Sequence, residues 1–268
     1  MTDPASDPII LYQHSVRKPM GAYPLLQGVP TMKRLPLSIL VAGLLTVAIC
    51  LAAEPPKHLT AANNLVDHLR LQNTSYRQGN PQVTWQGECQ SHTDCSGFLD
   101  ALLMHSYRYT EDDFKRWFDS HQPSARRYHD AIVAQRGFQH IHQLAEVQPG
   151  DILAVKYYKR TDNTGHVMLV ADPPHRSAPT PPVVTGTNQW EVPVIDSSRS
   201  GHGPTDTRHH RGPDGKDHDG LGRGVLRIYS DPQGHVVGFS WSSVSASKFV
   251  APGDEHLVIG RLIPGFKP

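Results

Sequence analysis

The chain is poor in cysteine, has no excess of charge of either sign and shows no internal repeat. Its 268 residues include three cysteines, 26 basic side chains and 25 acidic ones. Four basic and two acidic side chains precede Glu54, which leaves 22 against 23 in the rest of the chain. So balanced a charge gives no reason to expect nucleic acid or an anionic surface as a partner. Three cysteines also exclude a scaffold held together by several disulfides.

The apolar content, in contrast, is ordinary for a globular protein. Hydrophobic residues make up 38% of the chain, which excludes a disordered protein, and the length suits one sizeable domain or two small ones. Patterns typical of helices dominate the first half, and patterns typical of strands dominate the second. Helices followed by an antiparallel sheet predict an α+β domain.

Helix signals recur in the first half. Thr60 is a helix N-cap residue, and the apolar spacing after it predicts a helix to about Gln72. Thr110 precedes an acidic first turn, and Ser124 opens another helical pattern. The polar segment 76–92 contains turn residues, so we expect a loop there.

Strand signals and two insertions make up the second half. Residues 173–189, rich in Pro and Thr, and residues 197–223, rich in Gly, His and Asp, interrupt the strands. We expect about five to six strands in one antiparallel sheet. The expected strands are 152–158, 166–171, 190–196, 225–229, 235–241 and 256–262.

A basic and then apolar stretch near the N-terminus is typical of a secretory signal peptide. The basic residues Lys33 and Arg34 precede an apolar run over 35–49, and small residues follow at 52–53. We therefore interpret residues 32–53 as a signal peptide. The protein is expected in the periplasm, at the cell envelope or secreted, and in contact with the membrane only during export.

The segments on either side follow from this interpretation. Residues 1–31 lack a secretory pattern, so we interpret them as an extension in front of the true start codon, and 54–58 as a short linker. An uncleaved membrane anchor remains an alternative, since the apolar run is nearly long enough to span a bilayer. Lipid modification of Cys50 is a further alternative, which the bulky Ile49 before it disfavours.

A polar lead-in places a cysteine at the start of an apolar helical run. Asp94-Cys95-Ser96-Gly97 is followed by apolar residues at helical spacing, which predicts a helix from Cys95 to about Tyr107. A thiol in the first turn meets unpaired N–H groups and the positive end of the helix dipole, and both stabilise a thiolate. The same N–H groups can stabilise an oxyanion, and the small Ser96 leaves room for a substrate. We therefore interpret Cys95 as a nucleophile; an inert buried cysteine is the alternative.

Cys89 lies six residues before this cysteine. In an oxidising compartment the two could form a disulfide that masks the nucleophile. Two free thiols in the native protein would exclude that possibility.

A thiolate nucleophile needs a base, and the base needs an orienting group. His166 opens an apolar strand, and Asp196 ends the next one. If these strands pair as antiparallel neighbours, the two side chains lie close together. Cys95, His166 and Asp196 are therefore the expected catalytic residues, although a solvent-facing His166 and a capping Asp196 are the alternatives.

Three motifs in this order resemble the NlpC-type cell-wall peptidases, a papain-like superfamily. Residues 94–98 look like the family's nucleophile motif, 148–153 like its entry into the first core strand and 165–170 like its histidine strand. The resemblance implies a papain-like catalytic domain over 59–268, with the nucleophile helix packed on the sheet.

The resemblance also implies an activity. It is cysteine peptidase or amidase chemistry on cell-wall peptides, without a metal or organic cofactor. Tyr76 matches the tyrosine that assists the family's oxyanion site. Asp196 departs from the pattern, because it follows His166 by 30 residues rather than about a dozen. We expect an exported, monomeric hydrolase of amide bonds in peptidoglycan stem peptides.

Three other functions remain open. A transglutaminase-like acyltransferase also orders its residues as Cys, His and Asp. A catalytically silent cell-wall protein is a second alternative. A metal-binding protein is the third, because imidazoles and carboxylates crowd one segment. The weak metal candidates are His209, His210, Asp217 and His218.

Overall fold

Two apolar runs form adjacent antiparallel strands inside a large sheet. They are β5 (Ile152–Tyr157) and β6 (Gly165–Val170). Consecutive residues of β5 belong to different apolar clusters: Ile152 packs on one face of the sheet and Leu153 on the other. A continuous apolar run suits a strand that is buried on both faces.

The large sheet has eight strands in this computed structural model, which describes residues 54–160, 163–211 and 213–268. Seven lie in the order β10-β9-β8-β6-β5-β11-β4, β7 pairs with β8, and all these pairs are antiparallel. The other strands are β4 (Phe138–Ile141), β7 (His175–Arg176), β8 (Asn188–Ser198), β9 (Gly220–Ser230), β10 (Val236–Ser240) and β11 (Glu255–Leu262). The mixed class and the antiparallel sheet are confirmed. The expected five to six strands were too few, because β4 and β7 are too short to carry a readable pattern.

Four α-helices in the described residues accompany the sheet: α1 (Lys57–His68), α2 (Cys95–Tyr107), α3 (Glu111–Phe118) and α4 (Ala125–Val133). The prediction for α2 is confirmed at both ends, and Thr110 and Ser124 are the N-cap residues of α3 and α4. The predicted bounds of α1 were wrong. It begins earlier because the carbonyl of Pro56 accepts the N–H of Thr60, and it ends earlier because Leu69 is extended.

The polar segment before Cys95 is not a loop, contrary to the prediction. It contributes to a three-stranded sheet of β1 (Thr74–Tyr76), β2 (Gln82–Thr84) and β3 (Gln90–Thr93), in which β1 and β3 are parallel. Strands of three or four mostly polar residues give no clear alternation of apolar and polar side chains, so the turn residues dominated the pattern.

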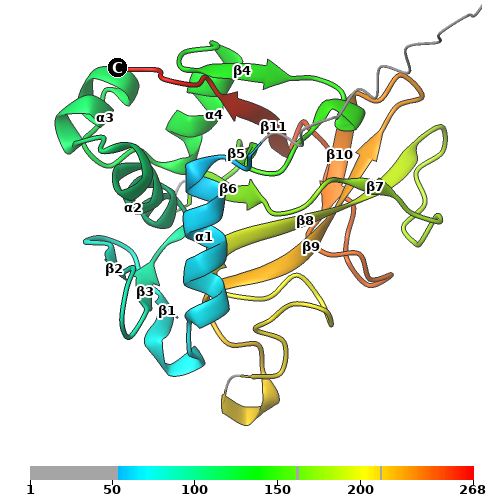
Figure 1. Ribbon diagram of the computed structural model, residues 1–268. Coiled ribbons are helices and arrows are strands. Elements are labelled where there is room, and N and C mark those ends of the chain that lie inside the picture. Colours follow the sequence, from blue (N-terminus) through cyan, green and yellow to red (C-terminus); the bar gives the residue numbers. More distant parts are fainter. Residues whose placement is uncertain (1–53, 161–162, 212) are drawn as a thin grey trace, which may run out of the picture. The chain divides into compact units, whose positions relative to one another are not determined.

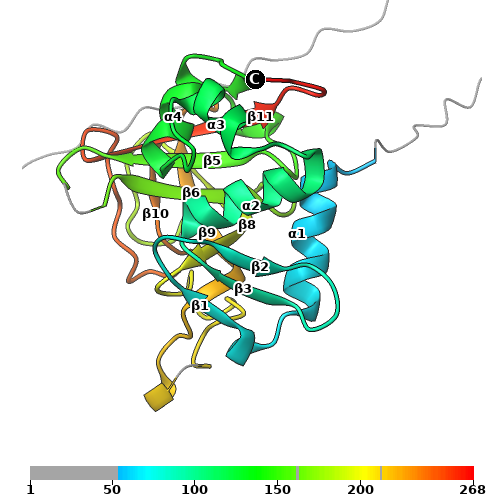
Figure 2. The ribbon, with the colours of Figure 1, turned by 90° about the vertical axis from the view of Figure 1, so that its left-hand side faces the viewer.

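The helices cover one face of the large sheet. The helix α2 packs on β6 and α4 on β5. Figure 2 shows α2 in front of the sheet, and both Figures 1 and 2 show the small sheet below α2. One apolar cluster fills the space between these helices and the sheet. A second cluster lies on the other face, where the sheet curves until β10 contacts β11. Apolar side chains therefore cover both faces of the large sheet. Polar groups can cluster only near the ends of its strands.

The two insertions are shorter than expected. The strands β8 and β9 pair over 11 residues each, so the second insertion is the loop 199–219, drawn in yellow at the bottom of Figures 1 and 2. The first contains β7 and gives way to β8 at Asn188. Within the described residues, no helix is both long and apolar enough to span a membrane. The proposed extension 1–31 and signal peptide 32–53 lie outside the described residues.

Candidate active site

Cys95 is the first residue of α2, as the sequence predicts. The preceding Asp94 caps the helix: its Oδ1 accepts the N–H of Gly97 at 2.7 Å, and its carbonyl accepts the N–H of Phe98 at 3.0 Å. Within the described part of the chain, the N–H groups of Cys95 and Ser96 have no such partner. Cys95 is 6% exposed, so its thiol sits at the positive end of the helix in a nearly dry place.

A hydrogen bond between β8 and β3 fixes this helix end beside the large sheet. Ser197 Oγ donates to the carbonyl of Thr93 at 2.6 Å, and both residues are fully buried. Ser197 follows Asp196, and Thr93 lies two residues before Cys95. The bond therefore links the segment that carries the thiol to the strand that carries the carboxylate.

His166 and Asp196 lie close together, as the sequence predicts. The strands β6 and β8 pair in antiparallel register at Leu169 and Ile195, which brings the two polar residues to one end of the pair. The distance from His166 Nε2 to Asp196 Oδ2 is 2.6 Å. Cys95 is close enough to the same imidazole to influence its pKa, and Nδ1 is the ring nitrogen that the bond to Asp196 leaves unused.

Position 165, directly before His166, has no space for a side chain. Gly165 has a φ of +157°, and a Cβ there would lie 2.0 Å from the carbonyl oxygen of Val155. A side chain at this position would push β6 away from β5. Glycine therefore allows the strand to start tightly enough to place His166 beside α2.

The charge state of His166 follows from its neighbours. Burial alone would lower its pKa, but Cys95 and Asp196 both favour the imidazolium and raise the pKa to about 10. The imidazole therefore holds a proton at neutral pH.

Two residues of loop 199–219 also contact the carboxylate of Asp196, Arg208 at the free oxygen and His202 at the oxygen that binds His166. Arg208 Nη2 lies 2.9 Å from Oδ1, and His202 Nε2 lies 3.2 Å from Oδ2, at ion-pair distance but outside hydrogen-bond geometry. His202 is fixed by its own Nδ1, which is 2.7 Å from the carbonyl of Trp241. The side chains of Asp196, His202 and Arg208 are completely buried.

Arg208 is itself fully satisfied by hydrogen bonds. Its guanidinium also donates to both carboxylate oxygens of Asp206 and to the carbonyls of Asp196 and Gly220. Gly224 makes room for this arrangement, because a Cβ there would lie 2.3 Å from Asp206 Oδ2. We call His202, Asp206 and Arg208 the carboxylate clamp.

The clamp keeps Asp196 ionised. Burial would raise the pKa of this carboxyl, but Arg208, His202 and the hydrogen bond from His166 hold it well below the usual range. The sequence analysis missed His202 and Arg208 as site residues. Their signal was the density of His and Asp in the insertion, which we interpreted as solvated or metal-binding.

A cavity of about 600 Å³ opens onto this centre. His166, Tyr76, Tyr157, Arg199 and Trp241 are among the residues that line it. Burial and the nearby Cys95 and Asp94 charges raise the pKa of Tyr76, so its hydroxyl remains a donor. The guanidinium of Arg199 lies 4.9 Å from the Tyr76 ring centroid. The cavity thus offers a donor, a cation and an imidazole to a substrate.

Ser96 faces elsewhere. Its Oγ donates to Asp94 Oδ1 at 3.3 Å, and the side chain lines a separate cavity of about 170 Å³. The structure therefore places Tyr76 at the cavity of His166, as predicted, and the Ser96 hydroxyl away from it.

Both thiols are free in the structure. Cys89 and Cys95 are buried, and no disulfide joins them. The alternative of a masking disulfide is therefore not the state described here.

The metal candidates separate into a group and an outlier. His209, His210 and Asp217 each offer a ligand atom within 4.8 Å of the others. His218 does not join them among the described residues, and its Nδ1 lies 2.6 Å from the carbonyl of Asp219.

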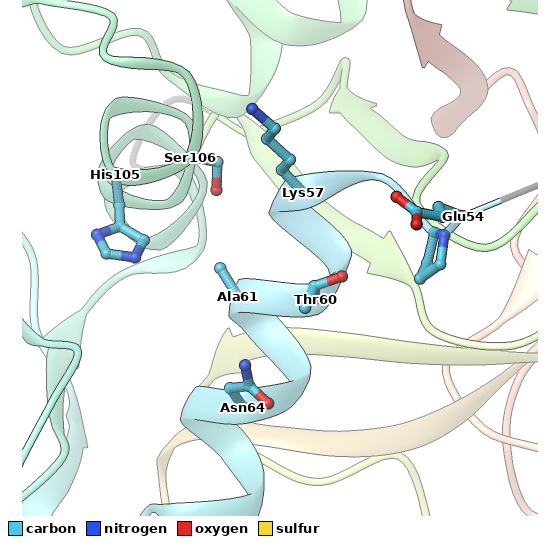
Figure 3. A pocket seen from close by; sticks show the side chains of 8 residues that line it. Glu54, Lys57, Thr60, Ala61, Asn64, His105 and Ser106 are labelled. Carbon is cyan, nitrogen blue, oxygen red and sulfur yellow. The ribbon is translucent and has the colours of Figure 1, made fainter.

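Two further hollows lie at the other end of α2. One has a volume of about 580 Å³ and lies between α1 and α2. Figure 3 shows its lining, in which Ala61 of α1 points toward Ser106 of α2, whereas Thr60 points away from it. The second, about 830 Å³, is lined by Tyr107 and by the C-terminal segment. With a rise of about 1.5 Å per residue, the last turn of α2 is roughly 15 Å from Cys95. Cys95 lines neither hollow.

Comparison with known proteins gives one family. The chain is 34% identical over 222 residues to "Uncharacterized protein R653" of Acanthamoeba polyphaga mimivirus, and the match covers 77% of this chain and 96% of the viral protein. The chain belongs to the family of this viral protein. No protein-family model and no solved structure matches the chain. The match extends over nearly the whole viral chain. The name of the viral protein assigns no activity.

Proposed function

We propose that the protein is a cysteine hydrolase of amide bonds, with Cys95 as nucleophile, His166 as acid and base and Asp196 as orienting group. The observation that carries the proposal is the 2.6 Å hydrogen bond from His166 to Asp196, next to a thiol at a helix N-terminus. These parts suit acyl transfer: a stabilised thiolate, a proton carrier and N–H groups near the reacting carbonyl.

The reaction begins with the proton already on His166, because the pKa of that imidazole is raised to about 10. The Cys95 thiolate attacks the carbonyl carbon of the amide, and the N–H groups at the start of α2 stabilise the oxyanion with the Tyr76 hydroxyl. His166 gives its proton to the leaving amine as the C–N bond breaks. Water then attacks the thioester carbon and His166 takes its proton. The C–S bond breaks, the acid product leaves and the Cys95 thiolate is restored beside the protonated His166.

The substrate class follows from the resemblance to NlpC-type peptidases and the papain-like order of nucleophile helix and histidine strand. We propose peptidoglycan stem peptides as substrate, an exported and monomeric protein, and the papain-like fold as its architecture. The eight-stranded antiparallel sheet with α2 packed against β6 supports that fold.

The test is the alkylation rate of Cys95 by iodoacetamide between pH 6 and 9, followed by mass spectrometry of the labelled peptide. We expect fast labelling at pH 6.5 and a loss of about tenfold or more in His166→Ala, since the imidazolium no longer stabilises the thiolate. Cys89→Ser is the matched control, because it removes the other buried thiol and should leave the rate at Cys95 unchanged. An equal rate in wild type and His166→Ala contradicts the proposal.

The substrate is tested separately with purified stem peptides. Hydrolysis that disappears in Cys95→Ser supports the proposed class. Added amine distinguishes hydrolysis from acyl transfer, because both pass through the same thioester but give an acid or a new amide. If Cys95 is alkylated quickly but stem peptides are not cleaved, the proposed cysteine chemistry stands and the proposed substrate is wrong.

A further inference from the structure

The far end of loop 199–219 carries two histidines and a carboxylate that the proposed reaction does not use. His209, His210 and Asp217 each place one ligand atom within 4.8 Å of the others, and His209 and Asp217 are half-buried while His210 is exposed. The two imidazole rings are 3.8 Å apart between centroids. A second independent observation comes from the hydrogen bonds of these rings.

Those hydrogen bonds show which nitrogen each ring can offer to a metal ion. His210 Nδ1 lies 2.5 Å from the carbonyl of Gly215, which can only accept, so Nδ1 carries the proton and Nε2 has a lone pair. Histidines that bind metals commonly donate from their other nitrogen to such a carbonyl. His209 Nδ1 lies 2.9 Å from Asp217 Oδ1, so an ion bound by these two atoms would replace the proton between them.

We propose that His209, His210 and Asp217 bind a divalent transition-metal ion of the Zn²⁺ type. Two imidazoles and a carboxylate suit zinc, whereas Ca²⁺ and Mg²⁺ prefer oxygen ligands alone. Zinc needs its ligand atoms about 2.0–2.2 Å away, so these side chains must close in by a modest rotation. Partly exposed side chains can make such a rotation without disturbing a packed core.

The ion would be structural, and its position explains what it would hold. His209 follows Arg208 of the carboxylate clamp, and the N–H of His218, next to Asp217, donates to the carbonyl of Arg208 at 2.8 Å. Asp217 Oδ2 also accepts the N–H of Gly201 at 3.0 Å. An ion on His209 and Asp217 therefore joins the two sides of the loop directly behind the clamp.

The experiment is a titration of the full chain, stripped of metal, with ZnCl₂ against a chromophoric chelator. We expect one tight equivalent of Zn²⁺, no comparable binding of Ca²⁺, and a Tm increase of about 5–10 °C at a free Zn²⁺ concentration of about 100 times Kd. His209→Ala/His210→Ala should weaken Zn²⁺ binding by at least about tenfold and remove the Tm increase.

The matched control is His140→Ala/His142→Ala, which removes another histidine pair whose ring centroids are 4.0 Å apart. It should bind Zn²⁺ as the wild type does. Binding lost in this control but kept in His209→Ala/His210→Ala overturns the proposal, and so does the absence of tight Zn²⁺ binding. If the double variant does not fold, His210→Ala alone gives the same decision, because this side chain is exposed. These readouts do not depend on Cys95, so their failure leaves the proposed hydrolase untouched.

Discussion

Arg208 and Asp196 form a completely buried ion pair, in which Nη2 lies 2.9 Å from Oδ1. The other carboxylate oxygen of Asp196 is the one that His166 uses. The loop that connects β8 and β9 therefore binds the carboxylate oxygen that His166 leaves free. The position of His166 thus depends on a segment that the sequence analysis treated as an insertion.

Arg208→Ala should unfold the protein more easily. Removing one partner of a buried pair leaves the other charge uncompensated, which costs about 3–5 kcal/mol. Urea unfolding measures this loss, and iodoacetamide labelling should show a slower reaction of Cys95 because His166 is less well oriented.

Arg223→Ala is the control for this substitution. Arg223 pairs with Asp67 at 2.9 Å, and the two side chains are 29% and 59% exposed, so its loss should cost less than about 1 kcal/mol. Equal destabilisation by both substitutions would contradict the role of Arg208.

The helix that begins at Cys95 and the strand that carries His166 could be predicted because their local signals agree with their tertiary surroundings. Asp94 supplies the cap that its position suggests, and the apolar run after His166 is buried on both faces. The antiparallel pairing of β6 and β8 then brings Asp196 to His166 despite 30 intervening residues.

The carboxylate clamp could not be predicted in this way. Arg208 and His202 stand among Gly, Asp and Thr, a composition that indicates a solvated loop. Their burial depends on long-range contacts, such as the carbonyls of Gly220 and Trp241, which no local pattern encodes. The strands β1 to β4 were missed for a related reason, since they are short and owe their pairing to distant partners.

His202→Phe tests whether this ring acts through Asp196. His202 lowers the pKa of Asp196, so its loss leaves more of the carboxylate charge to His166 and should raise the pKa of that imidazole further. We expect the alkaline limb of Cys95 reactivity to move up by about 0.5–1 pH unit. A lower Tm of His202→Phe with an unchanged pH profile of Cys95 alkylation would mean that His202 has only a structural role.

Tyr76→Phe separates oxyanion stabilisation from thiol activation. If the hydroxyl donates to the developing oxyanion, kcat for a chromogenic amide should fall about 100-fold. Alkylation of Cys95 forms no oxyanion, so its rate should stay the same. Tyr157→Phe is the control, since Tyr157 lines the same cavity and burial likewise raises its pKa. An unchanged kcat in Tyr76→Phe would exclude the proposed role.

Asp100→Asn should change how stability depends on pH. Asp100 is buried in α2 and accepts the Tyr128 hydroxyl at 2.6 Å, and burial raises its pKa well above the usual value. The folded state therefore keeps a proton that the unfolded state releases from about pH 4 upward. This contribution to stability is complete below the unfolded pKa and is lost as the pH rises through the folded one. The asparagine of Asp100→Asn does not titrate. The Tm of this variant should therefore rise relative to that of the wild type as the pH increases from about 4.5 to 8.

The opposite sign is expected for Asp113→Asn. Hydrogen bonds from Thr110 lower the pKa of Asp113, so this carboxylate stabilises the folded state above the unfolded pKa and loses that effect as the pH falls. Its replacement should therefore lose Tm relative to wild type as the pH rises from about 2.5 to 4.5, and the difference should stay constant above that range. Opposite slopes for the two variants would assign the raised pKa to the buried carboxyl in α2, and a flat difference for Asp100→Asn would mean that this group ionises as freely in the folded protein as in the unfolded chain.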